Sequence, residues 1–224
     1  MNGKGKLFGL GVGPGDPELM TLKAVRILKA CDTIAIPHRD PARCVALQIG
    51  AGAVPEILSR PILCLDMPMT RDKQARERAY GRATEQLTAA LNGGQSVAFL
   101  TLGDPSIYST FGYLAQRVAR AGFPVEIVPG VPSFCAAAAA LGEPLCADGE
   151  ALRILPGTEA KGGETWVYMK GGTADIKAAL ADHGGPVLAA QNVGMAGERL
   201  YRSMKEIPED GGYFTLIIAK EKET

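Results

Sequence analysis

Three short loops in this sequence combine glycine and proline with side chains that could bind a ligand or take part in a reaction. They are GLGVGPGDP at residues 9–17, LGDPSIY at 102–108 and VPGVPSF at 128–134. Each loop follows an apolar run that predicts a buried strand and precedes a stretch of helical composition. In open α/β sheets, ligands bind at the carboxyl ends of strands, where glycines allow close backbone approach. Together the loops predict one shared crevice.

The first loop indicates which ligands this crevice would accept. Its spacing is not G-x-G-x-x-G, because Pro14 stands three residues after Gly11, and it lacks the Lys-Ser/Thr ending of a nucleotide-triphosphate loop. Asp16 is a favourable cap for the next helix, and its charge would repel a phosphate there. The loop therefore favours a ligand without phosphates. A tight strand-to-helix turn with no ligand is the alternative.

The other two loops carry the side chains with reactive or binding groups. Asp104, between Gly103 and a proline, either hydrogen-bonds a ligand or caps its own loop. Tyr108 either stacks on a flat ligand or packs against the protein, and Ser133 either contacts a ligand or caps the helix that it begins. From these residues we take Asp104 and Tyr108 as the candidate catalytic groups.

Composition excludes several other classes of site. The chain has 224 residues, with 24 basic and 24 acidic side chains, and this neutrality disfavours a nucleic-acid partner. Five cysteines without a C-x-x-C pair and only two histidines predict neither a disulfide framework nor a metal site. No run approaches the roughly 18 apolar residues that a membrane helix needs. With no signal-peptide pattern at the start, we expect a cytoplasmic protein without a membrane partner.

The segments that must position the three loops alternate between strand and helix patterns. Expected strands lie at 6–12, 33–37, 62–65, 96–101 and 125–128, and expected helices at 17–30, from 42, 73–91, 110–120 and 133–141. Such alternation predicts a parallel α/β sheet.

A second region has a different pattern. Its expected strands are 151–155, 165–169, 187–191 and 213–219, with a helix at 173–182, which is closer to α+β. We therefore expect two α/β lobes, at 1–145 and 146–224, with a mainly parallel sheet in the first and a mixed sheet in the second. The ligand cleft would lie between them.

These motifs resemble the tetrapyrrole methylase family, the two-domain enzymes that methylate precorrins and uroporphyrinogen. The matching segments are GVGPGDPELMTLKA at 11–24, FLTLGDPSIYSTFGYL at 99–114 and VPGVPSF at 128–134, with weaker matches at 166–172 and 186–201. Within the family, PMTRDK at 68–73 and YSTFGYL at 108–114 are most similar to the branch acting on carbon 20 of precorrin-2 or its cobalt-containing counterpart, in corrin-ring (cobalamin) synthesis.

The resemblance implies S-adenosylmethionine as methyl donor, S-adenosylhomocysteine as product and a tetrapyrrole as substrate. It also implies which residues contact the cofactor: Pro14, Leu102, Gly103, Asp104, Ile107, Pro132, Ser133, Met169, Asn192 and Gly194. The segment AAQNVGM, which contains the last two, departs from the acidic-basic pair that this branch more often carries. We expect a homodimer.

The implied reaction moves a methyl group from a sulfonium to a nucleophilic ring carbon, so alignment should matter more than a strong base. Because the substrate carries many carboxylates, Arg71, Lys73 and Arg76 are candidates to bind them, with a solvated helix face as the alternative. Two further functions stay open at this point. One is a family transferase acting on another ring carbon or a protein side chain; the other is a non-catalytic or nucleotide-binding α/β protein.

Overall fold

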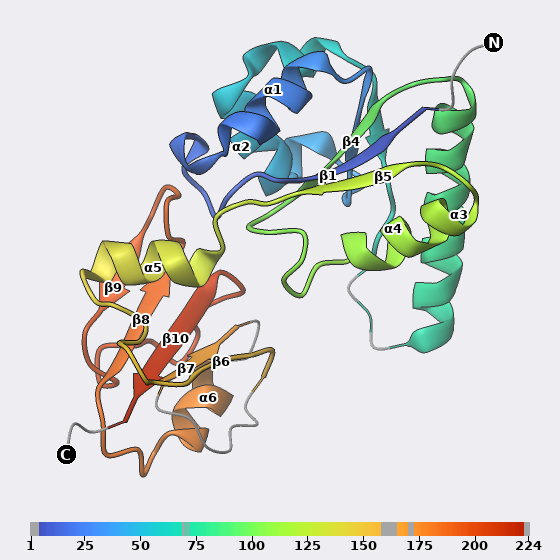
Figure 1. The fold of residues 1–224 in the computed structure, drawn as a ribbon. Helices are drawn as coiled ribbons and strands as arrows, with labels where there is room; N and C mark the ends of the chain where they lie inside the picture. Colours follow the sequence, from blue (N-terminus) through green and yellow to red (C-terminus); the bar gives the residue numbers. More distant parts are fainter. Residues whose placement is uncertain (1–4, 69, 71, 158–164, 170–172, 222–224) are drawn as a thin grey trace. The chain divides into compact units, whose positions relative to one another are not determined.

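The computed structural model describes residues 5–68, 70, 72–157, 165–169 and 173–221. The chain forms two compact units, Met1–Pro132 and Ser133–Thr224, and each contains its own sheet (Figure 1). The expected fold class of two α/β lobes is therefore confirmed. By its contacts, the helix at 133–141 belongs to the second unit. The domain boundary after residue 145 and the ligand cleft between the lobes stay predictions.

The first unit is built on a parallel sheet with the order β3-β2-β4-β1-β5. Its strands are β1 (Leu7–Gly11), β2 (Thr33–Ile36), β3 (Ile62–Cys64), β4 (Val97–Thr101) and β5 (Val125–Val128). Every pairing in it is parallel, as the alternating pattern predicts. Because β1 and β4 are neighbours in register, Gly11 lies opposite Thr101 at the carboxyl edge of the sheet.

Helices cover both faces of this sheet (Figure 1). They are α1 (Leu22–Ala30), α2 (Val45–Ala53), α3 (Lys73–Asn92) and α4 (Phe111–Arg120), with short 3₁₀ turns at Pro17–Leu19, Pro41–Arg43 and Pro55–Ser59 (η1, η2 and η3). In β4, Ala98 and Leu100 belong to the core shared with α1 and α2, whereas Phe99 belongs to the core shared with α3 and α4. This alternation is the two-residue period of a strand buried on both faces.

The first helix begins later than the sequence indicates. We expect it from residue 17, but Asp16 caps only the 3₁₀ turn η1, by accepting a hydrogen bond from the Glu18 amide at 2.8 Å. A second cap then starts α1, where the Thr21 hydroxyl accepts from the Ala24 amide at 3.2 Å. Two capping residues five positions apart each close their own short element, which periodicity alone does not separate.

The second unit contains a mixed sheet of order β6-β7-β10-β8-β9, as expected. Its elements are α5 (Ser133–Leu141), β6 (Leu152–Leu155), β7 (Thr165–Tyr168), α6 (Thr173–Ala179), β8 (Val187–Gln191), β9 (Arg199–Tyr201) and β10 (Thr215–Lys220). Only β6 and β7 pair in parallel. The sequence does not reveal β9, because it has three residues and none of them is fully buried.

An ionic cluster connects the starts of β1 and α1 with β5 in the first unit. The Glu126 carboxylate on β5 accepts hydrogen bonds from the Lys23 and Lys6 ammonium groups, each at 2.6 Å. These two bonds lower the pKa of Glu126 to about 2. The Glu126 side chain is 28% exposed, so water and salt screen the cluster and its contribution to stability is small.

We predict that Glu126→Gln lowers the melting temperature by a few degrees at pH 7, since exposed ion pairs contribute roughly 0–1 kcal/mol. A depressed pKa gives stability above the ordinary carboxyl value of 4.5 that is lost as the pH falls towards about 2. The difference from wild type should therefore shrink across that window. Thermal melts at low salt would measure it, with Glu85→Gln as control; a difference independent of pH would contradict the assignment.

Candidate functional site

The first two glycine loops meet just beyond the central strands. Gly13 and Gly103 form an isolated antiparallel bridge, in which the Gly103 amide donates to the Gly13 carbonyl at 2.8 Å. Their φ angles are +78° and +69°, a left-handed conformation that residues with a Cβ atom adopt only with strain. Both glycines are therefore required by the backbone conformation of the bridge.

The third loop packs its backbone directly on the other two. A Cβ atom placed on Gly130 would lie 2.8 Å from the Gly11 Cα, and one placed on Gly11 would lie 2.5 Å from the Gly130 amide nitrogen. Real Cβ atoms essentially never make contacts shorter than 3.0 Å. The structure thus brings the three loops together, and Gly11 and Gly130 allow their backbones to touch.

Two further glycines of the motifs have contrasting surroundings. The space beside Gly9 is filled by the ring of Phe111 from α4, so Gly9 serves packing between sheet and helix. Gly103 has room: a Cβ atom there would find its nearest neighbours, the Pro132 Cα and the Val131 carbonyl oxygen, at 4.0 Å. Gly103 is itself buried, but among these glycines it is the one beside which a Cβ atom would make no close contact.

Asp104 holds the second and third loops together. One carboxylate oxygen accepts from the Ser106 amide at 2.7 Å and from the Ser106 hydroxyl, and the other accepts from the Gly130 amide at 2.9 Å. The residue is 9% exposed. The carboxylate therefore satisfies the amide of Gly130, whose backbone is wedged against Gly11 and has no strand partner of its own.

Opposing effects set the protonation of Asp104. Burial acts to raise its pKa, but the hydrogen bonds from Ser106 and Gly130 outweigh burial and hold the pKa below the ordinary aspartate value. Asp104 is consequently ionised at neutral pH. Its carboxylate accepts hydrogen bonds from the second and third loops. This arrangement corresponds to the loop-capping alternative that the sequence leaves open.

The remaining predicted site residues of the first unit surround this junction. Pro14 is buried, and Leu102, Ile107 and Pro132 are half-buried. Tyr108 is 43% exposed and has a φ of +44°, a conformation that is uncommon for a residue with a side chain and is found often at functional loops.

The predicted site residues of the second unit lie at the ends of its elements. Ser133 begins α5, and Met169 follows β7 and donates its amide to the Leu155 carbonyl at 2.8 Å. Asn192 and Gly194 form a tight turn after β8, with φ angles of +53° and +74°. The Gly194 amide donates to the Glu198 carboxylate at 2.7 Å. These contacts define the turn, and the predicted cofactor roles of all four residues stay predictions.

Of the cations proposed for substrate carboxylates, Arg71 lies outside the described residues. Lys73 is exposed and Arg76 is half-buried, both in the first turns of α3. Asp72 begins this helix by accepting from the Gln74 amide at 2.8 Å. The predicted contacts of these cations with a substrate stay predictions.

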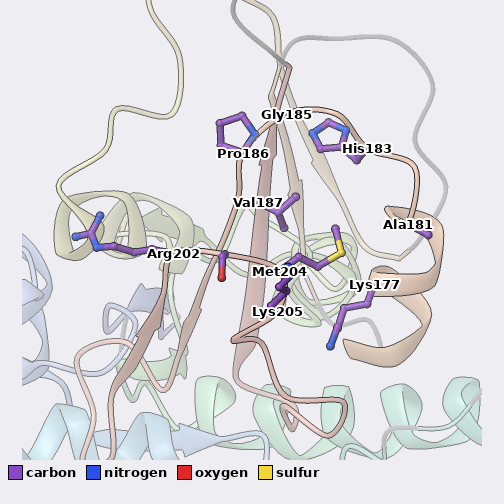
Figure 2. A pocket seen from close by; sticks show the side chains of 10 residues that line it. Lys177, Ala181, His183, Gly185, Pro186, Val187, Arg202, Met204 and Lys205 are labelled. Atoms are coloured by element: carbon purple, nitrogen blue, oxygen red, sulfur yellow. The ribbon is translucent and has the colours of Figure 1, made fainter.

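A pocket of about 550 Å³ lies within the second unit, away from the turn after β8 (Figure 2). Its lining includes Lys177, His183, Arg202 and Lys205, together with Val187 at the opposite end of β8 from Asn192. Lys177 is engaged by the Glu209 carboxylate at 2.6 Å, and Arg202 donates to the Leu141 carbonyl at 2.8 Å. Two of its cations thus already have partners, and none of the predicted site residues lines it.

In the described part of the chain, no group of three or more histidine, cysteine or acidic residues is arranged to hold a metal ion. The expectation of a metal-free protein stays a prediction. None of the described helices combines the length and apolar character needed to cross a membrane.

Sequence reasoning left the capping partners of Asp104 unnamed and missed the contact between the first and third loops. The Asp-Pro-Ser order at 104–106 is the available signal for the Ser106 bonds, because aspartate commonly accepts from the residue two positions on. Nothing in the sequence signals the contact of Gly11 with Gly130.

The Thr101 hydroxyl at the end of β4 is buried without a hydrogen-bond partner among the described residues. A bound water or a loop adjustment commonly relieves such a situation.

Comparison with known proteins gives consistent similarities. The sequence pattern of the Tetrapyrrole (Corrin/Porphyrin) Methylases matches residues 6–207. A cobalt-precorrin-2 C(20)-methyltransferase of Salmonella typhimurium is 33% identical and aligns over 97% of both chains. A precorrin-2 C(20)-methyltransferase of a Sinorhizobium species is 36% identical over 71% of this chain and 67% of that relative. The crystal structure of uroporphyrin-III C-methyltransferase from Thermus thermophilus, complexed with S-adenyl homocysteine, has a TM-score of 0.67 and 25% identity, covering 97% and 98% of the two chains.

The different surroundings of the glycines predict different effects on stability. Gly130→Ala forces backbones apart and should lower the free energy of unfolding by about 1–3 kcal/mol. Gly103→Ala would place its Cβ atom at ordinary van der Waals distance from Val131 and Pro132. It should therefore cost only its left-handed conformation, about 1–2 kcal/mol. Gly112→Ala, in α4 with nothing within 4 Å, should stabilise by roughly 0.5–1 kcal/mol. Urea denaturation would measure all three; Gly130→Ala as stable as wild type would contradict the close packing.

Proposed function

The chain belongs to the tetrapyrrole (corrin/porphyrin) methylases, and from this premise we propose that it methylates carbon 20 of precorrin-2 or of its cobalt-containing counterpart. The donor in this proposal is S-adenosylmethionine, and the reaction is a step of corrin-ring synthesis. The observation that carries the substrate is the end-to-end similarity, over 97% of both chains, to a relative named for this reaction.

The first unit's loops fit this cofactor. S-adenosylmethionine has no phosphate, and the carboxylate of Asp16 at the start of η1 disfavours a phosphate at that place. The lack of a side chain at Gly103 leaves space beside its backbone, where a neutral or zwitterionic group can approach closely. The solved relative complexed with S-adenyl homocysteine supports the same class of ligand.

We assign the cofactor's binding residues as the family resemblance implies. The loop with Leu102, Gly103, Asp104 and Ile107 would hold the amino-acid end, and Pro14 faces the same place. Pro132 and Ser133 would touch the cofactor from the third loop. In the second unit, Met169 would flank the adenine and the turn of Asn192 and Gly194 would cover the adenosine.

S-adenosylmethionine supplies an electrophilic methyl group on a positively charged sulfur. The task of the protein is to hold the donor methyl group and the acceptor carbon in line. Such positioning removes a large part of the activation barrier in transfers of this kind. A rigid loop junction suits this task, because misplacement by about 1 Å can reduce the rate about a hundredfold. The contacts of Gly130 and Asp104 that hold the loops together would provide that rigidity.

After methylation, the ring carbon must lose a proton. Both carboxylate oxygens of Asp104 already accept hydrogen bonds from Ser106 and Gly130, which favours a positioning role for this residue. Tyr108, exposed on the same loop, is the better placed of the two candidates to meet the substrate and to relay that proton through its hydroxyl to water.

We also retain the proposals of a homodimer in the cytoplasm without a nucleic-acid partner. The balanced charge of the chain supports the last of these. Sedimentation of the purified protein would test the assembly, and a monomer at micromolar concentration would reject it.

Gly103→Val should weaken the binding of S-adenosylhomocysteine at least tenfold, about 1.4 kcal/mol. The reason is that a branched side chain would occupy the space beside the Gly103 backbone. Calorimetric titration measures the affinity, and circular dichroism confirms the fold.

Gly142→Val is the matched control, because Gly142 has the same φ of +69° and no neighbour within 4 Å, but follows α5. It carries the same backbone strain without touching the loops, and should leave the affinity unchanged. If wild type and a folded Gly103→Val protein bind S-adenosylhomocysteine with equal affinity, this loop is only a turn and does not hold the cofactor. Binding of NAD or ATP, but not of S-adenosylhomocysteine, would reject the cofactor itself.

The reaction should place one new methyl group on carbon 20 when the protein is incubated with S-adenosylmethionine and either precorrin-2 or its cobalt form. Using both forms also decides which one is the substrate. NMR of a carbon-13 methyl label identifies the position. A methyl at carbon 11 or 17 would reject the branch and leave the family intact.

A further inference from the structure

An exposed aromatic ring stands at the start of α4. Tyr113 is 59% exposed, whereas Tyr80 of α3 beneath it is only 5% exposed. The two rings stack with centroids 5.3 Å apart and planes inclined by 13°. Tyr80 therefore supports one face of the Tyr113 ring and leaves the other face to solvent. An exposed aromatic held flat by a buried one is a ready surface for another flat group.

Two arginines accompany this pair of rings. The Arg117 guanidinium lies 6.0 Å from the Tyr80 ring centroid and pairs with the Glu77 carboxylate. Arg76 precedes Tyr80 by about one turn of α3, at i and i+4, so the two side chains lie on the same face of that helix. Arg76 is half-buried and forms no ion pair with any residue that the structure describes. A partly buried, uncompensated cation favours an anionic ligand.

The rings are also fixed in relation to the cofactor loop. α4 follows the 102–110 loop, so its first turn lies at the carboxyl end of β4, where ligands of such sheets bind. Phe111, which opens the helix, is buried and packs on Phe99 with ring centroids 5.4 Å apart. The α3 and α4 helices lie side by side (Figure 1). Tyr113 is therefore carried by a rigid element.

We propose that Tyr113 and Arg76 position the tetrapyrrole substrate: the Tyr113 ring stacks on a pyrrole ring, and Arg76 binds one of the carboxylate arms. A tetrapyrrole joins flat conjugated rings to several carboxylates, which is the chemistry that an aromatic face beside an arginine recognises. The inference rests on the proposed function and deepens it, because it assigns residues for the macrocycle in place of the methyl donor. Neither residue takes part in the chemical step.

The test compares kcat and KM for precorrin-2 in the full-length protein, together with the affinity for S-adenosylhomocysteine. Tyr113→Ala should lower kcat/KM for the tetrapyrrole about fivefold to tenfold, mainly through KM, in keeping with the size of aromatic contacts. Arg76→Gln should lower it about tenfold, as expected for a charge-assisted hydrogen bond. Neither variant should change the S-adenosylhomocysteine affinity more than about twofold, since the cofactor is held elsewhere. Tyr113→Phe keeps the ring and should recover most of the loss.

Two matched variants serve as controls. Leu58→Ala removes an apolar side chain of the same exposure, 58%, from η3, which precedes β3. Arg78→Gln removes a charge from α3 two residues from Tyr80, where the helix presents a different face. Both should behave as wild type.

The outcomes separate the two proposals. If the Tyr113→Ala and Arg76→Gln variants methylate the substrate as well as wild type does, this inference alone is overturned. Equal losses in tetrapyrrole and cofactor binding would show that the two side chains only maintain the fold, and would also overturn it. A wild-type protein that binds S-adenosylhomocysteine but no tetrapyrrole, by absorbance titration under anaerobic conditions, would overturn both proposals.

Discussion

The organisation of this protein depends on one steric constraint, the contact of glycine backbones where β1, β4 and β5 deliver their loops. Gly11 and Gly130 lie too close for either to carry a side chain, and Gly13 bridges to Gly103 through backbone hydrogen bonds. The order β3-β2-β4-β1-β5 places these three strands side by side, so their carboxyl ends converge. Chain segments more than a hundred residues apart thereby become one rigid junction, with space for a close approach beside the Gly103 backbone.

Electrostatics reinforces the junction without providing a strong base. Both carboxylate oxygens of Asp104 accept hydrogen bonds, one from its own loop and the other from the third loop. These hydrogen bonds keep Asp104 ionised. A methyl transfer from a sulfonium needs alignment more than proton abstraction, so a buried carboxylate that fixes geometry suits the proposed reaction. The proposed substrate side is different in character: Tyr113 stacks on Tyr80, and the Arg117 guanidinium lies 6.0 Å from the Tyr80 ring centroid.

Much of the fold and the grouping of the loops follow from the sequence, because apolar runs, glycine turns and caps are local signals. The alternating pattern predicts the parallel sheet, and the polar turn at Asp210–Gly211–Gly212 marks the entry to β10. Local signals fail where tertiary contacts decide. The cap at Thr21 divides a helix that looks continuous, Gly9 makes room for Phe111 rather than for a ligand, and the stack of Tyr113 on Tyr80 joins residues 33 positions apart. The roles of Met169, Asn192 and Gly194 depend on a bound cofactor and stay predictions.

The central claim is that the junction around Gly103 is the place where the methyl donor binds. The most direct measurement is the nitrogen-15 amide spectrum of the wild-type protein during titration with S-adenosylhomocysteine. Our account predicts that the amides of residues 102–107 and 130–133, that of Gly103 foremost, shift in a saturable manner. Saturable shifts confined to other regions, such as the pocket lined by Lys177 and Arg202, with the Gly103 amide unmoved, would contradict it.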